Sequence, residues 1–188
     1  EVTVPFTRSR DKPSADAPPL YRLYYQAVFW VVETTVDATG TAWYTLQDDR
    51  LAHKYYVRAS HLRLFTDAEL APVSPAVPPE AKRIEVDLTK QSLTAFESEQ
   101  PVFTATIASG WLRRDPQPGE GRTVTPIGTY SVFEKVPSRH MGEGQLTSDL
   151  DADELPGVPF VSFFHMQGTA FQGAFFNASG VRERAGEL

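Results

Sequence analysis

The sequence contains no cysteine among its 188 residues. This absence excludes a disulfide framework, a thiolate metal site and a cysteine nucleophile within these residues. It does not indicate a cellular compartment, because a chain without cysteine tolerates oxidising and reducing surroundings alike.

Long apolar runs and basic residues are also scarce. No run approaches the ~20 apolar residues that span a bilayer; residues 24–32 are apolar but include Gln26 and precede Glu33, which predicts a buried strand. Residues 1–10 lack the pattern of a secretory signal, so a secreted form would be a mature chain. The 18 Lys and Arg against 24 Asp and Glu give a net charge of −6. This balance argues against nucleic acid or an anionic membrane as partner.

Proline and aromatic residues are abundant. There are 15 prolines and 22 aromatic residues, a composition that favours β structure with many turns. Four prolines fall within residues 71–79, which can form neither a helix nor a central strand. The sequence therefore predicts a stiff linker over residues 71–81, between one domain at residues 1–70 and another at 82–188.

The first predicted domain alternates short strands with turns. Such spacing without a long helical period predicts a small barrel. Trp43, Tyr44, Tyr55 and Tyr56 belong either to its core or to a glycan- or peptide-binding face. The expected strands are residues 20–24, 27–33, 41–46, 55–59 and 62–65, with turns at residues 37–40 and 47–50.

The second predicted domain continues in the same style. Residues 89–90 fit a hairpin turn, and the Gly-, Asp- and Pro-rich residues 143–159 predict a long loop, which in a compact domain is usually functional. The expected strands are residues 83–88, 91–96, 102–108, 129–133, 160–165 and 170–176.

No metal or cofactor site is expected. His53, His61, His140 and His165 show no paired ligand spacing. His140 either touches a substrate or is an exposed loop residue. Asp149, Asp151 and Asp153 hint at a calcium loop, but Glu154 and Phe160 stand where an EF-hand needs Gly and Glu, so a solvated acidic loop is the simpler interpretation.

Several motifs of the second part resemble the L,D-transpeptidase catalytic domain of bacterial cell-wall enzymes. Residues 82–110 are similar to its first two hairpins, Thr125, Pro126 and Gly128 match its TP-x-G segment, and residues 155–177 resemble the strand pair leading to its active site. The segments TAWYTLQDD and YYVRASHLRLF resemble an SH3-like wall-associated module. The resemblance implies an all-β protein of the bacterial envelope, with an SH3-like barrel before a β-sandwich and peptidoglycan stem peptides or glycan as partners.

The family's reaction implies residues that this chain lacks. A Cys attacks the stem-peptide amide and passes the acyl group on as a thioester, with a His base and backbone donors for the oxyanion. The His motif here reads FQGAFF, which places Gln172 at the base position and Gly173 beside it, unless the stretch is misaligned and Gln172 is an ordinary strand residue. The resemblance places Phe171, Gly173, Phe176 and Asn177 at the substrate cleft.

The family's Ser-His-Gly-Cys motif is also absent. Its usual separation would place it at residues 185–188, which read AGEL. We therefore expect a C-terminally incomplete sandwich with no intact catalytic residue. Ser179 could replace the nucleophile, but no base lies near it in sequence, and a solvated serine is the simpler interpretation.

Three functions remain open from the sequence. The chain is an inactive or incomplete copy of a wall-crosslinking enzyme, a non-catalytic module that binds peptidoglycan, or a scaffold that contacts other envelope proteins. The absent cysteine and Gln172 favour the inactive relative.

Overall fold

The computed structural model describes residues 1–49, 53–110, 124–142, 154–166 and 168–172. It divides into two compact units. One consists of Glu1–Phe65 with the described residues from Tyr130 onward, and the other is Thr66–Thr129. Strands predominate in both, which confirms the all-β class. In the described part of the chain, no helix is long and apolar enough to cross a membrane.

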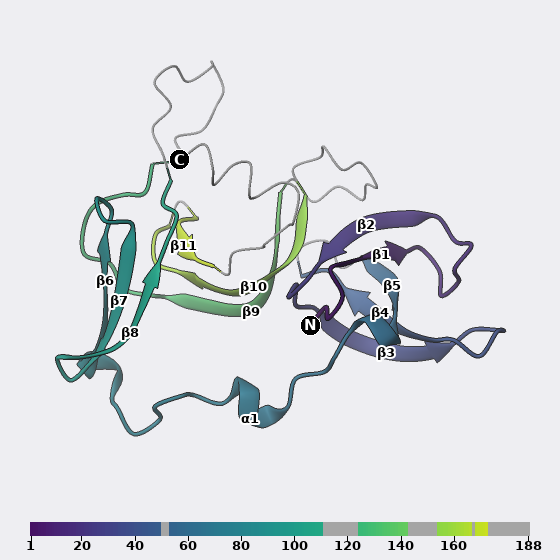
Figure 1. The fold of residues 1–188 in the computed structure, drawn as a ribbon, viewed down its shortest axis with the longest axis horizontal. Coiled ribbons are helices and arrows are strands. Elements are labelled where there is room, and N and C mark those ends of the chain that lie inside the picture. The colour runs from purple at the N-terminus through teal and green to yellow at the C-terminus, as the bar shows by residue number, and fades with distance from the viewer. Residues whose placement is uncertain (50–52, 111–123, 143–153, 167, 173–188) are drawn as a thin grey trace, which may run out of the picture. The chain divides into compact units, whose positions relative to one another are not determined.

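The first unit contains a five-stranded antiparallel sheet that curls into a barrel (Figure 1). Its strand order is β2-β1-β5-β4-β3, so β2 and β3 are its edges. The 3-10 helix η1 (Ala59–His61) follows the last strand. The strands are β1 (Phe6–Arg10), β2 (Pro19–Tyr24), β3 (Trp30–Val36), β4 (Ala42–Gln47) and β5 (Lys54–Arg58).

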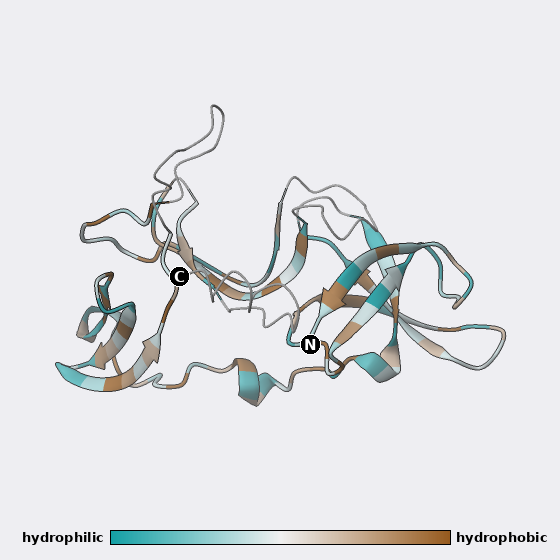
Figure 2. Ribbon diagram, turned by 45° about the horizontal axis from the view of Figure 1, so that its top comes forward, coloured by the Kyte–Doolittle hydropathy of each residue, from teal (hydrophilic) through white to brown (hydrophobic). Residues whose placement is uncertain are grey.

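Alternation of apolar residues gives this sheet its core, and Figure 2 shows hydrophobic and hydrophilic residues mixed along its strands. Tyr21 and Leu23 on β2, and Tyr55 and Val57 on β5, are buried two residues apart, as the strand period of two requires. Each such side chain contributes about 1.5–3 kcal/mol by leaving water. Trp43 and Tyr55 are each 1% exposed, so the core interpretation is right for both. The packed cluster is Val2, Tyr21, Leu23, Ala27, Leu46, Tyr55, Val57 and Leu62.

The predicted turn at residues 37–40 is confirmed. Asp37 Oδ1 accepts hydrogen bonds from the backbone N–H groups of Thr39 (2.8 Å) and Thr41 (3.0 Å). Its Oδ2 accepts one from Trp43 Nε1 at 2.9 Å. Gly40 has a φ of +83°, which a glycine adopts without steric cost.

The rest of the first unit is an antiparallel ribbon of three strands in the order β11-β10-β9 (Figure 1). They are β9 (Glu134–Met141), β10 (Leu155–Phe163) and β11 (Ala170–Phe171). The strand predicted at residues 129–133 is wrong, because the strand begins only at Glu134. Of the predicted loop, residues 143–153 lie outside the described part of the chain.

Residues 155–159 were expected in the same loop and instead begin β10. This part of β10 pairs with β9 alone, since β11 reaches only Ser162 and Phe163. The free edge and a bulge between Leu155 and Val158 accommodate the prolines and glycine that predicted a loop.

The ribbon packs against the barrel inside this unit. Val28 N donates to Gly157 O at 2.9 Å, and Ser138 Oγ donates to Val28 O at 2.6 Å. The Phe29 ring lies against Gly157, and the Phe65 and Phe160 rings meet at 5.8 Å between centroids. Residues over 100 positions apart thus share one packed interface.

The second unit is a meander of three antiparallel strands in the order β6-β7-β8. The predicted hairpin turn is confirmed, as Asp87 Oδ1 accepts from the N–H groups of Thr89 (3.0 Å) and Lys90 (2.9 Å). The boundary predicted at residues 71–81 stays a prediction. The elements are α1 (Asp67–Leu70), η2 (Pro79–Ala81), β6 (Lys82–Asp87), β7 (Ser92–Glu97) and β8 (Gln100–Thr106).

Candidate functional site

The predicted transpeptidase site falls at the end of β11. Phe171 closes this strand and is half-buried, and Gln172 follows it with an exposed side chain. The other residues predicted there, Gly173, Phe176 and Asn177, lie outside the described residues, as does Ser179.

A cluster of aromatic rings supports this end of the hairpin. The Phe164 ring lies 4.7 Å from that of Phe171 and 5.7 Å from that of Tyr130, between centroids. Tyr130 also meets the His165 ring edge-on at 5.4 Å. Thr169 O accepts from the N–H groups of Phe164 and His165, which closes the turn between β10 and β11. These contacts fix the backbone from which Gln172 extends.

Gln172 itself has no acid–base chemistry. A carboxamide donates and accepts hydrogen bonds but does not titrate in the physiological range. It could orient a peptide group of a ligand, but it could not take a proton from a thiol.

The TP-x-G segment lies in the second unit. Thr125 Oγ1 accepts a hydrogen bond from Gly110 N at 2.8 Å, which fastens the segment to the residues that follow β8. Gln91 braces the same stretch, since its Oε1 accepts from Ser109 N at 2.9 Å and its Nε2 donates to Ser109 Oγ at 2.8 Å.

A second polar centre lies where the ribbon meets the barrel. The His140 side chain on β9 is buried, and its two ring nitrogens face two carboxylates. Nδ1 forms a very short hydrogen bond with Asp48, and Nε2 lies 2.5 Å from Glu154 Oε2. Asp49 accepts from His140 N at 2.7 Å and from Arg139 Nη1 at 3.3 Å. The exposed histidine expected from the sequence is wrong, because β9 extends through position 140 and buries it.

The electrostatics of this centre favour a charged imidazole. Burial by itself lowers the pKa of His140, but the hydrogen bonds to Asp48 and Glu154 outweigh it, and the pKa is raised above its ordinary value. Burial and the charge of Asp48 raise the pKa values of the Tyr21 and Tyr55 hydroxyls, which therefore stay neutral.

The arrangement does not form a metal centre. The two ring nitrogens diverge, and each is occupied by one carboxylate. Within the described ranges, no three His, Cys, Asp or Glu side chains converge as metal ligands would. The calcium alternative concerned Asp149, Asp151 and Asp153, which lie outside those ranges.

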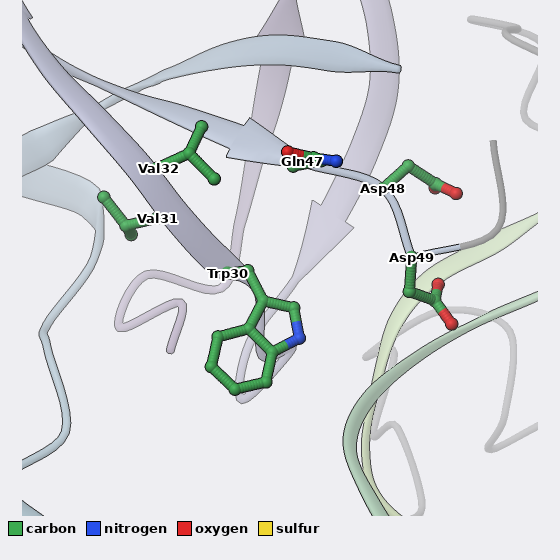
Figure 3. Close-up of a pocket in the computed structure, with 6 residues that line it drawn as sticks. All are labelled: Trp30, Val31, Val32, Gln47, Asp48 and Asp49. Carbon is green, nitrogen blue, oxygen red and sulfur yellow. The ribbon is translucent and has the colours of Figure 1, made fainter. Parts of the chain in front are cut away.

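An open pocket of about 350 Å³ lies at the edge of the barrel (Figure 3). Trp30 at the start of β3 is 53% exposed and lines it, with Val31 and Val32 from the same strand. Gln47, Asp48 and Asp49, at and after the end of β4, complete the lining. The sequence prediction assigned Trp30 to a buried strand, since its neighbours are apolar on both sides.

Comparison with known proteins identifies the lineage of the second half. Residues 81–171 match YkuD, the L,D-transpeptidase catalytic domain, and this segment belongs to that family. The family acts on peptidoglycan and is associated with the cell wall. No curated protein and no solved structure matches the chain.

The match covers β6 to β11 and ends at Phe171, one residue before Gln172. It confirms the resemblance drawn from residues 82–110, 125–128 and 155–171. The barrel of residues 1–65 lies outside it, so its SH3-like character stays a prediction.

Proposed function

We propose that this chain is a non-catalytic member of the L,D-transpeptidase lineage that binds peptidoglycan stem peptides in the bacterial envelope. The observation that carries the proposal is the pairing of Gln172, directly after the family segment, with the absence of cysteine from all 188 residues. Acyl transfer through a thioester needs a thiolate and a base that accepts its proton. These residues supply neither.

Retained binding is supported by what surrounds the missing groups. The hairpin that ends at Phe171 keeps its turn and its aromatic packing, so an ordered aromatic surface remains beside Gln172. An amide such as Gln172 can hydrogen-bond a peptide ligand without catalysing its cleavage. A scaffold for envelope proteins would use other surfaces and would not need this one.

The absence of catalysis is tested with a β-lactam, which acylates transpeptidase nucleophiles. The purified chain is incubated with the compound and its intact mass is measured. We expect no mass increase, because no thiolate is available to open the ring. A stoichiometric adduct would refute inactivity, and its loss in Ser179→Ala would identify the serine as a substitute nucleophile.

Wall binding is tested by sedimentation with purified sacculi. We expect the chain to co-sediment and Phe171→Ala to weaken binding about tenfold, which corresponds to the ~1.4 kcal/mol of one aromatic contact. Val36→Ala, at an exposed residue of β3, serves as the matched control and should bind normally. If the unmodified chain stays in the supernatant, wall binding is wrong and the scaffold alternative gains.

A further inference from the structure

We infer that Asp48, His140 and Glu154 form a protonation-dependent latch that holds the β9–β10 ribbon on the barrel. The inference is independent of wall binding and concerns how the two parts of the first unit stay together. It rests on the arrangement of three side chains that come from the turn after β4, from β9 and from the residue before β10.

The geometry requires a charged imidazole. A neutral imidazole carries one N–H and can donate to only one acceptor. Here both ring nitrogens face carboxylate oxygens at hydrogen-bond distance. Both nitrogens must therefore carry a proton for both contacts to be favourable. The histidine is only 2% exposed, so water cannot replace a lost partner.

The neighbouring groups reinforce this requirement. Asp49, on the same turn as Asp48, binds Arg139 and the backbone N–H of His140. From β2, the Tyr21 ring meets the imidazole edge-on at 5.5 Å, and the Tyr55 ring on β5 lies 5.4 Å from Tyr21. Both tyrosines are neutral, so His140 and Arg139 are the cations that balance Asp48, Asp49 and Glu154 at this interface.

Loss of the proton opens the latch. A deprotonated His140 leaves one nitrogen lone pair facing a buried carboxylate, and a buried charge without its partner is strongly destabilising. The pKa of His140 in the folded state is raised above the ordinary value near 6.5. The stabilisation is therefore complete below about pH 6.5 and is lost as the pH rises through the higher folded value.

The latch has a defined mechanical target. Ser138 and Gly157 lie on the same two strands as His140 and Glu154, and both contact Val28 on the barrel. Release of His140 therefore loosens this second contact as well. Since β10 continues into the hairpin that ends at Phe171, the protonation state also controls how firmly that hairpin is held.

The charge state is tested directly on the full chain by nitrogen-15 NMR of its histidine side chains. We expect His140 to show two protonated ring nitrogens at pH 7, and to titrate above the exposed His53. A neutral His140 at pH 7, or titration at or below that of His53, would overturn the inference.

Two variants separate the latch from a general effect of charge. Glu154→Gln removes one carboxylate, so a single N–H suffices and the His140 titration should move down towards that of His53. Glu134→Gln, at an exposed residue of the same β9 strand, should leave it unchanged. Equal titrations of His140 in the unmodified chain and in Glu154→Gln would refute the role of the second carboxylate.

Opening is measured by hydrogen exchange, corrected for its intrinsic dependence on pH. Between pH 6 and 9 we expect protection of the Val28 and His140 amides to fall at least tenfold, while the β4–β5 amides keep theirs. In His140→Gln the pH dependence should vanish. Unchanged protection at Val28 and His140, or a parallel loss across the barrel, would contradict a local latch.

Discussion

Replacing Gly157 by alanine tests how closely the ribbon and the barrel are packed. Gly157 has a φ of +80°, in the left-handed region that residues with a Cβ adopt only under strain. An added Cβ would also lie 2.5 Å from Phe29 Cε1, nearer still to Cζ, and 2.8 Å from Val28 O. Such contacts are far shorter than van der Waals separations of about 3.5–4.0 Å. Either the ribbon or the aromatic ring must therefore move.

The magnitude follows from two contributions. The left-handed backbone costs about 1–2 kcal/mol for a residue with a Cβ. Overpacking of a tight site adds about 1–3 kcal/mol. We expect Gly157→Ala to lower the free energy of unfolding by about 2–5 kcal/mol, a large share of the 5–15 kcal/mol typical of a folded domain.

Two other glycines provide matched controls. Gly40 and Gly168 have φ values of +83° and +88°, but an added Cβ would meet nothing within 4 Å at either position. Alanine there should cost the backbone contribution alone, about 1–2 kcal/mol. Adding Phe29→Ala to Gly157→Ala removes the ring that clashes, and the two changes should couple by about 1 kcal/mol or more.

The assay is urea denaturation followed by tryptophan fluorescence. Trp43 is 1% exposed in the barrel, so its emission reports on that part of the structure. If the ribbon and barrel unfold together, Gly157→Ala lowers the midpoint of the Trp43 transition without changing its slope. A loss no larger than that of Gly168→Ala would refute the close contact between Phe29 and Gly157.

Two further substitutions probe buried and exposed polar groups. The Tyr21 hydroxyl is buried and has no hydrogen-bond partner among the described residues, so Tyr21→Phe should leave stability unchanged or raise it by about 1 kcal/mol in urea denaturation; a loss above ~1 kcal/mol would show a missed partner. Hydrogen bonds from Thr39 and Trp43 lower the pKa of Asp37 from 3.8 to about 2, so its stabilisation is complete above pH 3.8 and disappears as the pH falls through 2. Asp37→Asn should flatten the stability profile between pH 4 and pH 2, whereas Asp16→Asn should follow the unmodified chain.

The strands that alternate regularly could be predicted from the sequence, and the irregular ones could not. β2, β4 and β5, and the meander of β6 to β8, all show apolar residues at a period of two. β1 reads FTRSR, and its buried positions are Thr7 and Ser9, so hydrophobicity does not reveal it. Ser9 is buried because its Oγ accepts from Tyr21 N at 2.9 Å, a contact that depends on tertiary pairing.

The acid–histidine cluster was beyond the reach of sequence spacing. Asp48 and His140 are 92 residues apart, and Glu154 follows 14 residues later. No local period relates such positions, so the sequence offered only an isolated histidine in an expected loop. The family segment was easier to predict, because its motifs are contiguous and occur in a characteristic order.

The split of the first unit along the chain also has a consequence for folding. During synthesis the barrel residues emerge first, yet Val28 and Asp48 find their partners only after another 90 to 110 residues have followed. The meander of β6 to β8 needs only local contacts and can form in the interval, whereas pairing over such separations is slow. Until the ribbon arrives, the barrel presents an unfinished apolar seam around Phe29. Chaperone binding, or association between nascent chains, should therefore concentrate in that interval.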